Sequence, residues 1–208
     1  VEVLKGTGVL KGSETIQLET LNDLLNVDFK PNQEIALVAE TPSAFASTCV
    51  YNTPTVENIE EFMQMRIATN YMSEIATNTI RVEMGAYGAF ATTYNGSVVF
   101  LSYRTPKPFE SIDYYKNLVS SIIESDINAD IFEGAKRNVV GDFLKYESKR
   151  SKARRHDLFV ATNRDMLDIE KRKIDAVLNF KQEDMKVLLK KYFTNVDYHT
   201  CVATNTKM

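Results

Sequence analysis

A short stretch of this 208-residue sequence places two strong hydrogen-bond donors six positions apart. Arg81 offers a guanidinium that stays charged, Tyr87 offers a phenol hydroxyl, and Gly85 and Ala86 come directly before the tyrosine. Small residues let a backbone turn sharply and let another surface approach closely. We therefore expect a turn that presents two donors. The alternative is a surface arginine beside a half-buried strand tyrosine, which the composition by itself allows.

The other catalytic patterns that a sequence can reveal are missing. The two histidines, His156 and His199, belong to no HxxH, HExxH or HxxEH pattern, so we do not expect a zinc site built within this chain. The sequence has no GxSxG nucleophile motif and no complete glycine-rich phosphate-binding loop. Cys49 and Cys201 form no CxxC pair, and we expect two buried free thiols in a reducing compartment, with a disulfide between them as the alternative.

A basic run lies in the second half of the sequence, between residues 145 and 155. A nucleic-acid site would need aromatic side chains for base stacking, and Tyr146 is the one aromatic residue there. The pattern favours an exposed helix face or loop, and a docking surface for an acidic partner domain is the functional alternative. The basic residues of the run are Lys145, Lys149, Arg150, Lys152, Arg154 and Arg155.

The composition is that of an ordinary globular protein, because 44% of the residues are hydrophobic and 25% are charged. The 25 Lys and Arg residues against 28 Asp and Glu residues give a net charge of −3, which argues against a dedicated nucleic-acid-binding protein. No apolar run reaches the roughly 18 residues that a membrane-spanning helix needs. We therefore expect no nucleic-acid partner and no membrane span.

The elements on either side of the Arg–Tyr segment are predicted from periodicity. Apolar positions that step by three and four line one face of a helix, which runs from the capping residues 53–55 to about Thr77. After the glycine turn, two alternating runs at residues 89–94 and 97–103 are joined by Asn95-Gly96, the dipeptide typical of a type I′ hairpin. The donor pair is therefore expected between a long helix and a β-hairpin.

The rest of the sequence predicts further strands and a group of helices. An apolar run at residues 34–40, a segment at 47–51 and a closing segment at 197–203 are predicted strands. Helices are predicted after Pro108, from Asn128 or Asp130, at residues 164–178 and at residues 182–193.

This order of elements predicts an α+β fold with a mainly antiparallel sheet and helices packed on one face. We expect the first buried strand, at residues 34–40, and the closing strand, at residues 197–203, to share one sheet although they are far apart in the sequence. Residues 1–32 are predicted to be a weakly patterned lead-in or linker. Residues 33–208 are predicted to be a single α+β domain.

The segment around Arg81 resembles the R-x-x-G-G-A-Y-G signature of the presequence-protease branch of pitrilysin/insulysin-type zinc metallopeptidases. In that family too, the motif follows a helix and precedes a hairpin that ends in Ser-Tyr-Arg-x-Pro, as residues 102–106 do here. The segment from Gln182 onward is also similar to the end of a family domain. Two positions depart from the signature, because Met84 replaces the first glycine of the pair and Glu83 replaces the preceding lysine.

The resemblance implies a pitrilysin/mitochondrial-processing-peptidase-like domain, the last of four homologous α+β domains that form two halves of a longer enzyme. In such enzymes the N-terminal half holds zinc through HxxEH and a further Glu. The zinc-free C-terminal half closes a chamber around an unfolded peptide. The resemblance therefore implies no cofactor in this chain and zinc in the N-terminal half of the full-length protein. The implied partners are that half of the same polypeptide and the unfolded peptide substrate.

The resemblance also implies roles for individual residues. Arg81 and Tyr87 would be catalytic residues that donate hydrogen bonds to the carbonyl oxygen of the substrate, where negative charge develops in the transition state. Gly85 and Ala86 would bind the substrate. The chain would be part of a zinc metalloendopeptidase and would be inactive by itself.

Two other functions remain open at this point. A relative could keep this fold as a catalytically inactive structural subunit or scaffold. Alternatively, the chain could be an unrelated protein-binding α+β module that docks through its basic run. For each of these functions, the lack of a disulfide framework predicts an intracellular, reducing compartment, whether a mitochondrion, another organelle or the cytoplasm.

Overall fold

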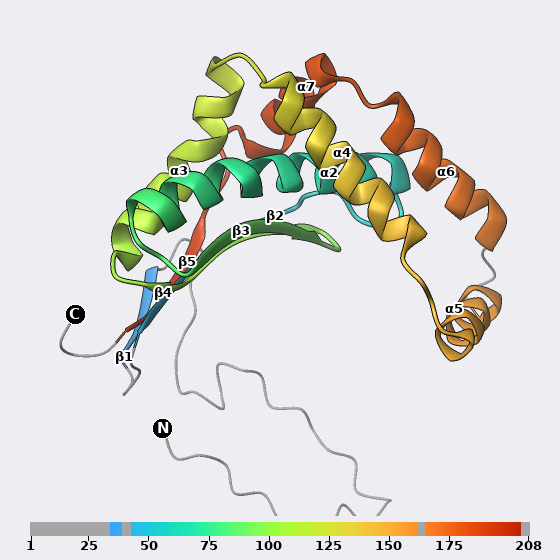
Figure 1. The fold of residues 1–208 in the computed structure, drawn as a ribbon, viewed down its shortest axis with the longest axis horizontal. Coiled ribbons are helices and arrows are strands. Elements are labelled where there is room, and N and C mark those ends of the chain that lie inside the picture. The colour runs from blue at the N-terminus through green and yellow to red at the C-terminus, as the bar shows by residue number, and fades with distance from the viewer. Residues whose placement is uncertain (1–33, 39–42, 162–164, 205–208) are drawn as a thin grey trace, which may run out of the picture. The chain divides into compact units, whose positions relative to one another are not determined.

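The computed structural model describes the backbone of residues 34–38 and all atoms of residues 43–161 and 165–204. These residues belong to one unit of the chain, residues 32–208. The predicted lead-in at residues 1–32 lies outside the described residues, so it stays a prediction. Within the described unit, one sheet forms a layer and the helices lie together on one side of it (Figure 1). This arrangement confirms the predicted α+β fold.

The strands of the sheet are β1 (Glu34–Val38), β2 (Ala44–Tyr51), β3 (Gly88–Tyr94), β4 (Ser97–Thr105) and β5 (His199–Thr204). Their order is β1-β5-β2-β4-β3. β1 and β5 are parallel neighbours, and the other pairs are antiparallel. The first and last strands therefore share one sheet, as predicted. β2 begins at Ala44 rather than Ser47, because Ala44 and Ala46 continue its buried face although alanine is a weak strand former.

The helices are α2 (Ile59–Ala76), α3 (Pro108–Glu124), α4 (Ala129–Leu144), α5 (Lys149–Ala161), α6 (Met166–Asn179) and α7 (Gln182–Phe193). A π-helix, η1 (Thr77–Glu83), continues α2. α2 and α3 lie against the sheet, and α4 and α6 pack on α2. Five of the six basic residues of the run lie in α5, which buries none of its residues, so most of the run is the exposed helix face that the sequence favoured, and Lys145 lies at the end of α4. None of the described helices is both long and apolar enough to cross a membrane.

The start of α2 differs from the prediction. The side chain of Asn58 caps the helix, since its Oδ1 accepts a hydrogen bond of 3.3 Å from the backbone N–H three residues on. Thr53 donates its backbone N–H to the carbonyl of Gly96 at 3.3 Å, and Gly96 donates its own N–H to the carbonyl of Pro54 at 3.2 Å. The predicted cap at residues 53–55 was therefore wrong, because the backbone of that segment pairs with the hairpin turn instead.

The hairpin of β3 and β4 turns at Asn95-Gly96, as predicted, but the turn is not type I′. A type I′ turn needs positive φ at both central residues, and of these two only Gly96, with φ +84°, has it. The side chain of Asn95 accepts a hydrogen bond of 2.9 Å from the backbone N–H of Val56. This contact ties the hairpin turn to the segment that leads into α2.

The two faces of the sheet differ in burial. Side chains alternate between the two faces along each strand. In β4, Phe100 and Ser102 are buried under the helices. Leu101 and Tyr103 lie on the opposite face and are only half-buried. Tyr115 of α3 closes the core from the helical side, and its hydroxyl donates to the carbonyl of Leu101 at 2.8 Å. The buried face therefore fixes α2 and the hairpin against each other, and these two elements carry the Arg–Tyr segment.

Candidate functional site

Arg81 lies in the π-helix that prolongs α2. Ile80 is fully buried, whereas Arg81 and the two residues after it are exposed. The hydroxyl of Thr77 donates to the carbonyl of Ala89 at 2.9 Å, so the start of the π-helix is tied to strand β3. The sequence placed Arg81 just beyond a helix that ends at about Thr77. The structure instead places the guanidinium on a helical turn, anchored by its buried neighbour.

The turn between Arg81 and Tyr87 depends on one glycine. Gly85 has φ +80°, the left-handed conformation that commonly ends a helix and that residues with a side chain rarely adopt. The N–H of Ala86 then donates to the carbonyl of Ile80 at 3.1 Å and closes the helix end. Gly85 is exposed and Ala86 is buried, so of these two predicted substrate-binding residues only Gly85 presents its surface to solvent.

Met84, which replaces the first glycine of the family signature, fits the turn. Its backbone has φ −92° and ψ −10°, a conformation open to any residue, so this position does not require glycine. Its side chain is partly buried and packs against the hydrophobic core. The added bulk therefore points into the domain, and the departure at Met84 leaves the exposed donors accessible.

Tyr87 is exposed, but its ring is held from two sides. Its side chain is 60% exposed, and its ring centre lies 5.6 Å from that of Tyr103 at an interplanar angle of 59°. The guanidinium carbon of Arg104 lies 5.3 Å from the Tyr87 ring centre, within cation–π range. The backbone N–H of Tyr87 also donates to the carbonyl of Arg104 at 3.3 Å. The exposed Tyr87 ring is thus supported by Tyr103 and Arg104.

Two backbone features make this support possible. Arg104 has φ +50°, which is uncommon for a residue with a side chain and marks local strain. At Gly88, a Cβ atom would lie only 2.5 Å from Cζ and 2.6 Å from Oη of Tyr103. Glycine therefore lets the Tyr103 ring lie directly on strand β3, where it also contacts Phe90 with ring centres 6.4 Å apart. In the sequence, Gly88, Tyr103 and Arg104 stand out only as members of the family motifs, and no role is predicted for them.

β3 is the edge strand of the sheet, yet its outer side is covered next to the donor pair. The carbonyl of Ala89 accepts from Thr77, as noted above. The Ser73 hydroxyl accepts from the N–H of Ala91 at 2.7 Å and lies 2.8 Å from the Ala91 carbonyl. An extended peptide needs these same backbone groups in order to add to a sheet edge. The segment can therefore offer side-chain donors to a ligand, whereas strand addition at residues 89–91 is blocked.

The described residues do not fit a metal centre. Within residues 43–161 and 165–204, no group of three His, Cys, Asp or Glu side chains could hold a metal ion. His156 is exposed, and His199 packs edge-on against the ring of Tyr51 with ring centres 4.9 Å apart. Cys49 and Cys201 are free thiols and only half-buried, although burial still raises the pKa of Cys201. Arg81 and Tyr87, the exposed side chains at the two ends of the turn, are hydrogen-bond donors.

Comparison with known proteins supports the resemblance found in the sequence. A family model described as "PreP C-terminal domain" matches residues 47–202. No curated protein matches the chain by sequence. Many solved structures share its fold.

Three of these structures illustrate the likeness. The inactive peptidase domain of a candidate zinc protease from Bordetella parapertussis has a TM-score of 0.65 and 12% identity, over 82% of this chain and 99% of that one. The inactive domain of a peptidase M16 from Pseudomonas fluorescens has a TM-score of 0.62 and 11% identity, over 86% of this chain and 46% of that one. Pitrilysin has a TM-score of 0.61 and 12% identity, over 89% of this chain and 22% of its own. The chain thus spans less than half the length of the last two proteins.

Proposed function

Because this chain belongs to the PreP C-terminal domain family and has the fold of the inactive domains of M16 peptidases, we propose that it is the zinc-free last domain of a presequence-protease-type metallopeptidase that degrades unfolded peptides. In this proposal it closes the chamber of the enzyme over the N-terminal half and lends Arg81 and Tyr87 to the active site. The unpaired cysteines suit an intracellular, reducing compartment.

The observation that carries this proposal is that both donors are exposed and that their neighbours are packed. Arg81 is exposed on a helical turn and follows the buried Ile80. Tyr87 is exposed as well, and its ring contacts Tyr103 and Arg104. Pre-positioned donors lower a barrier because they need no reorganisation when charge develops. The alternative interpretation expects a half-buried strand tyrosine, whereas Tyr87 is exposed and lies directly before β3.

The proposed mechanism divides the work between the two halves of the enzyme. Zinc in the N-terminal half would supply polarisation of the scissile carbonyl and activation of the attacking water. Arg81 contributes a charged guanidinium, and Tyr87 contributes a neutral hydroxyl, to the oxygen that becomes negative as the carbonyl turns tetrahedral. Loss of one such donor typically lowers turnover on the order of 10²–10³-fold. Since the donors sit on a different half from the metal, the active site is complete only when the chamber is closed.

The test is a kinetic comparison in the full-length enzyme with an unfolded peptide as substrate. Tyr87→Phe removes one hydroxyl and Arg81→Ala one guanidinium, and each is expected to lower kcat about 10²–10³-fold while zinc content and thermal stability are unchanged. Tyr94→Phe and Arg137→Ala are matched controls, since both side chains are exposed elsewhere on the domain and should leave kcat unaltered. If Tyr87→Phe and Arg81→Ala kept the wild-type rate, the proposed role of the two donors would be wrong. If the wild-type enzyme itself cleaved no peptide, the scaffold function would be favoured instead.

A further inference from the structure

Helix α5 has no share in the hydrophobic core. None of its thirteen residues, Lys149 to Ala161, is buried. Figure 1 shows it at the end of the helical layer, apart from the sheet. Isolated helices of this length are marginal in water, and most protein helices are stabilised by packing an apolar face. Another kind of contact must therefore hold α5 in place.

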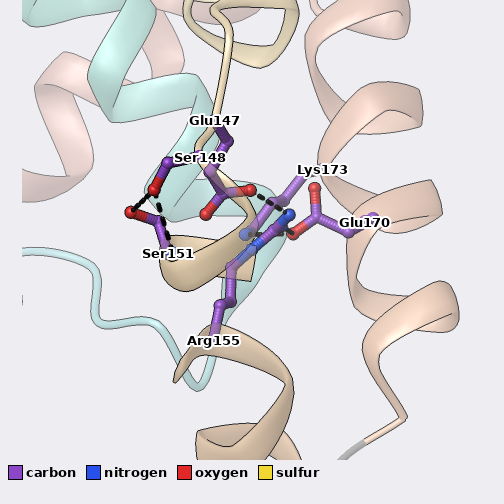
Figure 2. A network of polar contacts seen from close by, with 6 residues as sticks. All are labelled: Glu147, Ser148, Ser151, Arg155, Glu170 and Lys173. Atoms are coloured by element: carbon purple, nitrogen blue, oxygen red, sulfur yellow. Dashed lines mark hydrogen bonds and ion pairs between the residues drawn. The ribbon is translucent and has the colours of Figure 1, made fainter. Parts of the chain in front are cut away.

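A cluster of ion pairs supplies that contact (Figure 2). Arg155 of α5 reaches Glu147 at 2.7 Å and Glu170 of α6 at 3.0 Å, and Lys173 also pairs with Glu170 at 3.0 Å. The hydroxyl of Ser148 accepts from the backbone N–H at position 151 at 3.2 Å and caps the helix. Arg155 thus fixes α5 to α6 and leaves the remaining basic side chains of the helix turned to solvent.

The remaining basic side chains repel one another. Lys149, Arg150, Lys152 and Arg154 are all exposed, and the described part of the chain offers them no acidic partner. Arg150 and Arg154 are four residues apart, and Lys149 and Lys152 three, so each pair lies on neighbouring turns where like charges destabilise a helix. A surface of opposite charge would relieve this repulsion.

Large apolar side chains lie exposed beside the basic residues. Tyr146, in the connection that leads into α5, is 91% exposed, and Leu144 before it is 80% exposed. Val160 in the last turn of α5 and Leu167 at the start of α6 are 65% and 76% exposed. Interfaces commonly combine aromatic or aliphatic contacts with charged residues around them. The surface around α5 has both exposed apolar side chains and exposed basic side chains.

We propose that α5 and its flanking residues are a docking surface for an acidic segment of a partner polypeptide. The four exposed basic residues would pair with its carboxylates, and Tyr146 and Val160 would contact its apolar side chains. Charge complementarity is what selects such a partner. This proposal goes beyond the proposed peptidase role and does not depend on it.

Two other anionic partners fit the surface less well. Helices that lie on membranes carry an apolar stripe along their whole length. In α5 the basic residues occupy the first half and the apolar residues, 158–161, the end. A single-stranded nucleic acid would need aromatic side chains for stacking, and Tyr146 is the one aromatic side chain within the basic run. Because α5 has basic residues at its start and apolar residues at its end, its surface favours a polypeptide as the partner.

The docking surface lies away from the donor pair. Arg172 of α6 pairs with Glu60 in the first turn of α2 at 2.6 Å, whereas Arg81 follows the other end of α2. α2 has 18 residues, which corresponds to about 27 Å of helix between those ends. A polypeptide held by α5 would thus leave Arg81 and Tyr87 free.

The test measures binding of a fluorescent poly-L-glutamate peptide to the 208-residue chain at low and at high salt. The wild-type chain is expected to bind, and added salt is expected to weaken the complex. The double variant Arg150→Glu/Arg154→Glu should lose about tenfold or more in affinity. The control Lys171→Glu/Lys190→Glu makes the same change in net charge on exposed side chains of α6 and α7 and should bind as wild type does. Tyr146→Ala should weaken binding of a second peptide, a copolymer of glutamate and leucine, at high salt, where the apolar contact counts most, and should affect poly-L-glutamate less.

Several outcomes would overturn the proposal. Equal losses in the Arg150/Arg154 and Lys171/Lys190 variants would mean that net charge alone attracts the peptide. Tighter binding to single-stranded DNA or to vesicles of phosphatidylcholine with phosphatidylserine, abolished in the Arg150→Glu/Arg154→Glu variant, would assign the surface to that ligand instead. Circular dichroism of each variant checks that the fold is kept, which is expected because all five substituted side chains are exposed.

Discussion

A single methyl group at Gly88 should displace the ring that supports Tyr87. In the structure, a Cβ at position 88 would lie 2.5 Å from Cζ and 2.6 Å from Oη of Tyr103, far inside van der Waals contact. The Tyr103 ring is half-exposed, so it can swing away from the strand, but it then leaves both Tyr87 and Phe90. Each aromatic pair contributes about 0.5–1.5 kcal/mol. Replacement of a strand glycine by alanine by itself raises the free energy of unfolding by roughly 0.5–1 kcal/mol. The two pairs lost and the backbone gain leave a net loss of about 0–2.5 kcal/mol, so Gly88→Ala should lower the free energy of unfolding by about 1 kcal/mol.

Thermal denaturation of the 208-residue chain measures this effect, at roughly 2–4 °C in Tm for each kcal/mol. Gly141→Ala is the matched control, because a Cβ at that position in α4 would meet nothing within 4 Å. In a helix the same substitution should raise stability by roughly 0.5–1 kcal/mol. The two glycine-to-alanine changes are therefore predicted to shift Tm in opposite directions.

A second background separates ring displacement from other causes. In a chain that already carries Tyr103→Ala, the methyl group at position 88 has no ring to displace. Gly88→Ala should then be neutral or stabilising, since only the gain in backbone entropy remains. If the loss in Tm were the same with and without the Tyr103 ring, the close contact between Gly88 and Tyr103 would not be its cause, and the proposed support of Tyr87 would be refuted.

Three further predictions concern the capping, pH dependence and composition of the domain. Asn58→Ala should lower the free energy of unfolding by about 0.5–2 kcal/mol in urea titrations, because Asn58 caps α2, and Thr55→Ala should have a smaller effect. The hydrogen bond from Lys145, together with the charges of Lys145 and Arg66, outweighs partial burial and lowers the pKa of Asp142. Its contribution to stability is thus present above the ordinary aspartate pKa of about 4 and lost as the pH falls below it, so Asp142→Asn should flatten the urea-midpoint profile below about pH 4. The purified chain should retain no stoichiometric zinc by metal analysis and should leave an unfolded peptide intact. Retained zinc together with peptide cleavage would contradict the proposal that the N-terminal half holds the metal.

Periodicity predicted the elements that carry the donors. The helix of α2, the hairpin at Asn95-Gly96 and the shared sheet of β1 and β5 follow from apolar spacing and from the need to pair buried strands. Local chemistry that depends on distant partners was harder to predict. Residues 53–55 look like a helix cap, but the hairpin turn binds their backbone, and this contact spans some forty positions of sequence.

The site was predicted by residue type but not by its support. Arg81 and Tyr87 were singled out by their spacing, whereas the π-helix under Arg81 has no periodic signal of its own. The positive φ of Arg104 was also hidden, because left-handed backbone is expected at glycine or asparagine and rarely at arginine. A Gly directly after Tyr87 was the one available sign that another side chain approaches the strand closely.

The most direct test of the donor hypothesis is the inhibition constant of a peptide phosphonate, which mimics the tetrahedral intermediate, measured on the full-length enzyme. Donors that act only on the developing charge should bind this mimic and the transition state alike. Tyr87→Phe is therefore predicted to weaken phosphonate inhibition by the same factor by which it lowers kcat/KM, with KM for the peptide unchanged. An inhibition constant that stays at the wild-type value while kcat/KM falls would show that Tyr87 does not contact the reacting oxygen.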